Sequence, residues 1–178
     1  MNTFFTKLAF TNSVKEVQGF FGSRNNYGRI ERSGDGYELT MSEVDFIDPM
    51  DSFYMGTIGE NGWPYVQYRG GPKGFLKVID STTLGMANYR GNCQYISVGN
   101  TNVTKNISLF FMNYPVRSRL KIWANSEIVK VDQHPELLEK LRAPDYKAII
   151  ERVILFKVEA FDWNCPQHFT PKFTAEEI

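Results

Sequence analysis

Cysteine and histidine are scarce in this sequence. The 178 residues include two of each, and they are Cys93, Cys165, His134 and His168. Neither cysteine belongs to a CxxC pair, whereas protein zinc sites take most of their ligands from closely spaced cysteines and histidines. We therefore expect no metal site. Unpaired cysteines are typical of a reducing compartment, which predicts a cytoplasmic protein.

Net charge and long apolar runs are also lacking. Twenty basic side chains balance 20 acidic ones, so no global field favours nucleic acid or an anionic membrane as a partner. No apolar run approaches the roughly 20 residues that span a bilayer. The first residues include Phe4, Phe5 and Leu8 but lack a continuous signal-peptide core. We expect this segment to pack on the body of the protein, with neither nucleic acid nor a membrane as partner.

Apolar and aromatic residues are plentiful, at 42% and 15% of the chain. This composition and length predict a single well-packed domain over residues 1–178, with a helical extension over about residues 1–50. Thr40 and Glu43 have the spacing of a capping box, and the polar residues 23–39 predict a loop. The apolar spacing predicts helices at 12–22, 40–46, 92–101 and 134–142.

From Ser52 onwards the apolar pattern changes to a period of two, which is typical of strands. Asn61-Gly62 is a strong signal for a tight hairpin. Helices are missing between the first strands, which argues against a parallel sheet. We predict a mainly β protein with short helices, an antiparallel barrel or sandwich of about six strands. The expected strand segments are 52–59, 64–70, 74–80, 82–87, 107–113, 117–131 and 152–163.

One strand combines charge with glycine. Gln67 and Arg69 share a face of the strand 64–70, and Gly70-Gly71 follows. Glycines allow a ligand to approach the backbone closely, and Ser97 lies near a predicted helix start, where free N–H groups favour anions. The pattern predicts a phosphate site. A solvated arginine, an ordinary loop and simple helix capping are the alternatives.

A later strand also carries basic side chains on one of its faces. Arg119, Lys121 and Trp123 alternate with apolar residues, so they share one face of the strand 117–131. Such a face is usually solvated, but the tryptophan favours a flat ligand or a partner chain as its cover. Trp163 fits a core or interface position as well as a stacking position. Cys165 fits a small buried apolar residue better than a nucleophile, and His168 fits a surface residue better than a proton donor.

Four segments, in this order, resemble the pyridoxamine 5'-phosphate oxidase-like, FMN-binding split-barrel proteins. The resemblance covers roughly residues 40–173, which is most of the chain. The segments read DSFYMGTIGENGWPYVQYRGGPKGF, GNCQYISVGN, RLKIWANSEIV and VEAFDWNCPQHFTPKF.

The resemblance implies a six-stranded antiparallel Greek-key split barrel. It also implies a homodimer that holds FMN in two equivalent clefts at the subunit interface. In relatives the tail that corresponds to residues 163–168 reaches the partner's site. The cofactor-binding residues that it implies are Gln67, Tyr68, Arg69, Gln94, Ser97, Arg119, Lys121 and Trp163.

Two departures from the family pattern bear on the substrate. The family's oxidases have a basic pair in the phosphate segment, where this chain has Cys93 and Gln94. They also end in an Arg-x-His element, whereas no arginine stands two residues before His168. Both departures argue more strongly against a vitamin B6 substrate than against a flavin.

The resulting hypothesis is an FMN-dependent oxidoreductase that acts on an unknown small molecule. A flavin supplies the hydride or electron chemistry itself, which fits the lack of a recognisable catalytic triad or carboxylate pair. The catalytic residues therefore stay unassigned. The alternatives are a non-catalytic flavin-binding or storage module, a relative that uses a deazaflavin or haem, and a structural protein without a ligand.

Overall fold

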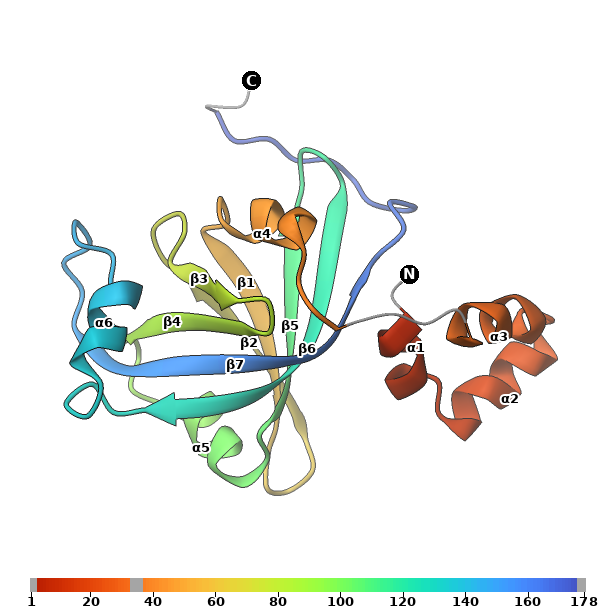
Figure 1. Ribbon diagram of the computed structural model, residues 1–178, viewed down its shortest axis with the longest axis horizontal. Coiled ribbons are helices and arrows are strands. Elements are labelled where there is room, and N and C mark those ends of the chain that lie inside the picture. The colour runs from red at the N-terminus through yellow and green to blue at the C-terminus, as the bar shows by residue number, and fades with distance from the viewer. Residues whose placement is uncertain (1–2, 33–36, 176–178) are drawn as a thin grey trace.

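The computed structural model describes residues 3–32 and 37–175. Seven antiparallel strands form one strongly curved sheet in the order β2-β1-β5-β6-β7-β4-β3 (Figure 1). The strands are β1 (Ser52–Ile58), β2 (Pro64–Gly70), β3 (Leu76–Asp80), β4 (Thr83–Tyr89), β5 (Asn106–Asn113), β6 (Ser118–Val129) and β7 (Ile150–Trp163).

The expectation of a mainly β antiparallel barrel is confirmed. The structure has seven strands and not the six that the resemblance implied, and each strand matches one of the expected segments. The short edge strand β3 pairs with β4 alone. Its pairing with β4 ends at Met86, so the last residues of β4 are left without a strand neighbour on that side. Asn88 lies in this opening.

The core forms because side chains alternate between the inner and outer faces along each strand. In β1 the side chains of Phe53, Met55 and Thr57 point inward and are buried, whereas Tyr54 and Ile58 point outward and are exposed. The inward side chains of six strands, β1 and β3 to β7, pack together as one apolar cluster that also includes Ile47. Burial of these side chains is the main force that holds the curved sheet together.

Two glycine-containing connections join the first strands. The hairpin at Asn61-Gly62 is confirmed, and Gly62 supplies the positive φ of +82° that the turn requires. Gly71 has a different role from the one its sequence context predicts. A Cβ atom there would lie 2.7 Å from Cγ of Phe75, so the glycine makes room for a core ring and not for a ligand.

The pairing of β6 with β7 contains a bulge. Trp123 lies opposite Ala160 and Ala124 lies opposite Val158, so Glu159 is the extra residue on β7. Beyond this point the inward and outward positions of β7 exchange, because one residue has been inserted into a pattern of period two. The exchange places Asp162 on the outer side, beside Lys121.

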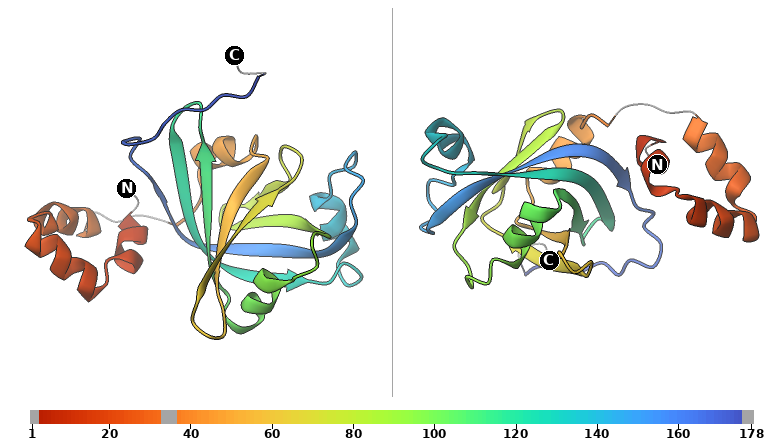
Figure 2. Two further views of the ribbon diagram at one scale, coloured as in Figure 1. Left: turned by 180° about the vertical axis from the view of Figure 1, so that it is seen from behind. Right: turned by 90° about the horizontal axis from the view of Figure 1, so that it is seen from below.

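Three helices lie against the barrel. Helices α4 (Met41–Ile47) and α5 (Ile96–Val103) lie at opposite ends, and α6 (Pro135–Leu141) lies beside β4 and β7 (Figures 1 and 2). The capping box of α4 is confirmed, since the Thr40 N–H donates to Glu43 Oε2 at 2.9 Å.

The N-terminal helices α1 (Thr3–Ala9), α2 (Asn12–Phe20) and α3 (Arg24–Arg32) lie to one side of the barrel (Figure 2). The α1 residue Phe5 packs on Trp123 at 4.9 Å between ring centroids, which confirms the expected packing of this segment.

The expected loop at 23–39 is wrong over Arg24–Arg32, where α3 forms. Its Glu31 pairs with both Lys15 and Arg24, and these ion pairs support a helix that the polar sequence did not reveal. Residues 33–36 of the expected loop lie outside the described residues. Among the residues that the structure describes, no helix is long and apolar enough to cross a membrane.

Candidate functional site

Polar side chains on the inner face of β2 meet side chains from β4 and α5 at one end of the barrel. Arg69 Nη1 donates to Asn88 Oδ1 at 3.2 Å, across the opening between β2 and β4. Ser97 Oγ donates to Gln67 Oε1 at 2.9 Å, which ties the first turn of α5 to β2. Asn88 and Ser97 are buried, so these contacts form a fixed polar wall. Together with Arg152 of β7, these four residues are called the anion cluster: Gln67, Arg69, Asn88 and Ser97.

Arg152 belongs to this cluster through its strand register. It lies opposite Asn88 in the β4–β7 pairing, and its guanidinium lies over the Tyr95 ring at 5.0 Å. Its Nη2 donates to Glu151 at 3.0 Å. Two arginines therefore flank Asn88, one from β2 and one from β7.

Both arginines have buried N–H groups without a hydrogen-bond partner among the described residues. These groups are Nε of Arg69 and Nη1 of Arg152. Burial lowers the pKa of Arg69, and nearby Arg152 lowers it further, while Tyr65 raises it. An arginine nevertheless stays charged in proteins. A buried N–H group without an acceptor is costly, so the free N–H groups of two arginines give the cluster the character of an anion site.

A hollow of about 60 Å³ lies at the anion cluster. Its lining includes Gln67, Arg69, Asn88, Cys93, Tyr95, Ser97 and the Glu151 carboxylate that pairs with Arg152, but not Arg152 itself. The loop before α5 closes it with two left-handed residues, Cys93 at φ 59° and Tyr95 at φ 54°. Gln94 is exposed and does not line this hollow. The sequence prediction for Gln94 as a ligand is therefore less well supported than those for Arg69 and Ser97.

The remaining predicted site residues lie elsewhere in the chain. Tyr68 is exposed on the outer face of β2, where its ring meets Tyr54. Lys121 Nζ pairs with Asp162 at 2.9 Å. Arg119 donates to the Cys165 carbonyl and lies over the Phe169 ring.

Trp163 is half-buried, packs against the core cluster and does not line the hollow at the anion cluster. Its ring meets Phe46 at 4.7 Å, and its Nε1 donates to Glu43 Oε1 at 2.7 Å. A single chain thus brings Gln67, Arg69 and Ser97 together and leaves Tyr68, Arg119, Lys121 and Trp163 outside the anion cluster. Their contacts with a cofactor stay predictions.

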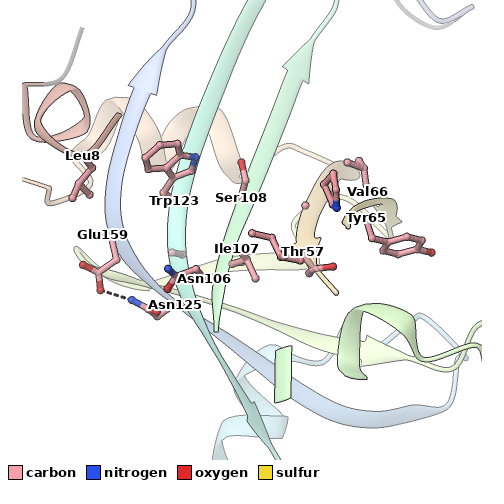
Figure 3. Close-up of a pocket in the computed structure, with 14 residues that line it drawn as sticks. Leu8, Thr57, Tyr65, Val66, Asn106, Ile107, Ser108, Trp123, Asn125 and Glu159 are labelled. Atoms are coloured by element: carbon pink, nitrogen blue, oxygen red, sulfur yellow. Dashed lines mark hydrogen bonds between the residues drawn. The ribbon is translucent and has the colours of Figure 1, made fainter. Parts of the chain in front are cut away.

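A second, larger hollow of about 650 Å³ lies on the outer side of the sheet (Figure 3). It opens where β1 and β5 separate, since their pairing ends at Gly56 and Ser108. Side chains from α1, β6 and β7 complete its wall, including Leu8, Trp123 and Glu159. We call it the outer hollow.

Sequence reasoning missed Asn88, Arg152 and Glu159. Each depends on the pairing of distant strands, which no local pattern reveals. Among the residues that the structure describes, no three His, Cys, Asp or Glu side chains are grouped so that they could hold a metal ion.

Comparison with known proteins supports the fold and little beyond it. No protein-family model matches the chain, and no curated protein sequence matches it. Solved structures do match. HupZ of Group A Streptococcus is 15% identical with a TM-score of 0.52, over 76% of this chain and 99% of the other.

A Clostridium acetobutylicum protein of the pyridoxinephosphate oxidase family, related to general stress protein 26, is 15% identical with a TM-score of 0.51. The match covers 77% of this chain and 94% of the other. An FMN-binding protein from Syntrophomonas wolfei is 13% identical with a TM-score of 0.50, over 70% and 88% of the two chains. The chain has the pyridoxamine 5'-phosphate oxidase-like split-barrel fold. The resemblance found in the sequence is thus confirmed at the level of the fold.

Proposed function

We propose that this protein is a flavin-binding oxidoreductase that holds FMN by its phosphate at the anion cluster. The observation that carries the proposal is a pair of half-buried arginines that each have a buried N–H group without a partner, Nε of Arg69 and Nη1 of Arg152. A phosphate oxygen accepts such hydrogen bonds more strongly than a neutral group does. The residues present therefore fit the phosphate of the cofactor.

The two arginines compensate for the basic pair that this chain lacks. Cys93 and Gln94 stand where the family's oxidases carry that pair, and they supply no positive charge. Here the charge comes from β2 and β7 instead, on either side of Asn88. Ser97 at the first turn of α5 adds a hydroxyl beside the helix N–H groups, which also favour an anion.

The bound flavin would supply hydride or electron transfer. The residues of this chain bind, orient and shield it. The substrate is a small molecule that the anion cluster does not specify.

A homodimer is part of the proposal, because one chain brings together only part of the predicted site. The outer face of β1 and β2 exposes the paired rings of Tyr54 and Tyr68, neither of which lines the outer hollow. Exposed apolar patches of this kind are typical of protein interfaces. The family resemblance implies that the tail of the second copy, residues 163–168, reaches the cofactor site.

The first test is the absorbance spectrum of the purified protein with added FMN, before and after gel filtration. The proposal expects flavin bands that co-elute with the protein at about one flavin per chain. Turnover with NAD(P)H and a small acceptor or oxygen would then establish an oxidoreductase. Flavin binding without turnover would favour a non-catalytic flavin-binding module. A protein that leaves FMN in the small-molecule fraction would contradict the proposal.

Variants locate the binding site. Arg69→Gln should weaken FMN binding about 10- to 100-fold, because one charged hydrogen bond contributes about 1.5–3 kcal/mol. Arg152→Gln should have a similar effect. Arg142→Gln is the matched control, since Arg142 is exposed and pairs with Glu139 on the surface. Equal affinities for all three variants would place the flavin elsewhere.

A further inference from the structure

The outer hollow differs from the anion cluster in size, position and character. The anion cluster lies on the inner face of β2, whereas the outer hollow lies where the β1–β2 hairpin separates from β5 and β6 (Figure 3). Its volume of about 650 Å³ falls in the range of small-molecule sites, about 300–1,000 Å³. We propose that the outer hollow is a binding site for a small aromatic amine.

One wall of the outer hollow is a fixed aromatic surface. The Trp123 ring faces the hollow (Figure 3) and is backed by Phe5, whose ring centroid lies 4.9 Å away. Phe5 is itself held by Lys121, whose Nζ lies 4.6 Å from its ring centroid. Leu8 of the same helix, α1, reaches the rim. The indole can therefore stack on a flat ligand without losing much side-chain freedom.

The bulge in β7 supplies the charge. Glu159 is the extra residue of that strand, and bulges commonly redirect one side chain next to a functional site. Asn125 Nδ2 donates to Glu159 Oε1 at 2.6 Å and fixes the carboxylate at the edge of the hollow (Figure 3). Among the described residues that line the hollow, Glu159 alone carries a charge.

Two lysines on β6 and β7 pair with other carboxylates and not with Glu159. Lys157, opposite Asn125, pairs with Glu127 at 3.9 Å. Lys121 pairs with Asp162, which is 1% exposed. The hollow therefore combines an aromatic wall, apolar sides from Leu8 and Ile107, and one negative charge. A planar apolar ring with a protonated amine matches all three features, through stacking, burial and charge.

The test uses tryptamine and indole as probes, measured by isothermal titration calorimetry on the full chain. Tryptamine carries the amine, and indole is the same ring system without it. We expect one tryptamine per chain, bound about tenfold more tightly than indole, because the ammonium adds a surface ion pair and a cation–π contact. The absence of saturable binding of either probe would overturn the proposal.

Two substitutions assign the binding to this hollow. Glu159→Gln keeps the acceptor for Asn125 but removes the charge, so it should abolish the preference for tryptamine while indole binding persists. Glu127→Gln is the control, because Glu127 is an exposed strand glutamate that does not line the hollow. A preference for tryptamine that survives in Glu159→Gln would overturn the proposal.

Leu8→Trp should fill the hollow and weaken both probes at least tenfold. Val17→Trp adds the same ring at an exposed position of α2 and should change neither affinity. Unchanged binding in Leu8→Trp would place the probes elsewhere. FMN binding should be the same in Glu159→Gln as in the parent protein, so this proposal and the flavin proposal can fail separately.

Discussion

The two faces of the β1–β2 hairpin are both rich in large side chains, yet they differ in what covers them. Phe53 and Met55 on the inner face are 2% and 1% exposed, whereas Val66 and Tyr68 on the outer face are 65% and 59% exposed. A solvated strand face normally carries polar side chains. The inner face therefore explains stability, and the outer face is the one that we propose as the contact with a second copy.

Truncating one aromatic ring on each face gives the largest expected difference. Phe53→Ala should lower the free energy of unfolding by about 3–5 kcal/mol, because a ring packed against Phe75 and Phe111 leaves a cavity. Tyr54→Ala on the outer face should cost less than about 1 kcal/mol. Urea denaturation, at a protein concentration where the chain is monomeric, measures both. Equal losses would remove the distinction between the faces.

A glycine on each face gives a smaller contrast. Gly71→Ala should destabilise the protein by about 1–3 kcal/mol, because the new Cβ would lie 2.7 Å from the Phe75 ring. Gly56→Ala should be within about 1 kcal/mol of neutral or stabilising, since its Cβ would meet Ser108 Cβ at an ordinary 3.6 Å. The same denaturation experiment applies. A larger loss for Gly56→Ala than for Gly71→Ala would contradict the packing described.

A charge on the outer face tests the proposed dimer. Tyr68→Asp should raise the dissociation constant for self-association at least about tenfold, because an unpaired carboxylate would be buried in the interface. Ile149→Asp is the matched control, at an apolar position 58% exposed on a different part of the molecule. Sedimentation equilibrium measures both. The same effect from both substitutions would exclude the β1–β2 face as the interface.

The smallest expected effect is a change in the pH at which Tyr95 ionises, beside the anion cluster. The Cys93 side chain and the hydrogen bond to Glu151 raise the pKa of Tyr95 to about 12. The protonated phenol is favoured in the folded state, so its contribution to stability is present below about pH 10 and is lost as the pH rises towards 12. The absorbance at 295 nm should differ between the parent protein and Tyr95→Phe near pH 12, where the Tyr95 phenol ionises. A transition near pH 10 would contradict this environment.

Patterns among residues close in sequence were sufficient to predict most of the architecture. Alternation identified the strands and placed Gln67 and Arg69 on one face, because a period of two follows from strand geometry alone. The capping box at Thr40 and the hairpin at Gly62 were equally visible, since each depends on residues close in sequence.

The features that sequence could not reveal depend on register. Glu159 is a bulge residue only because of how β7 pairs with β6, and Arg152 joins the anion cluster only because it lies opposite Asn88. Helix α3 was missed because its support comes from ion pairs with Glu31, not from an apolar stripe. Gly71 was interpreted as an approach to a ligand, whereas Phe75 fills that space.

The most direct test of the central claim compares FMN with riboflavin, which has the same ring system but no phosphate. If the anion cluster holds the phosphate, the parent protein should bind FMN at least about tenfold more tightly than riboflavin, since a charged hydrogen bond contributes about 1.5–3 kcal/mol. The Arg69→Gln/Arg152→Gln double variant should lose that preference while its riboflavin affinity stays unchanged. Equal affinities for the two flavins in the parent protein would contradict the account.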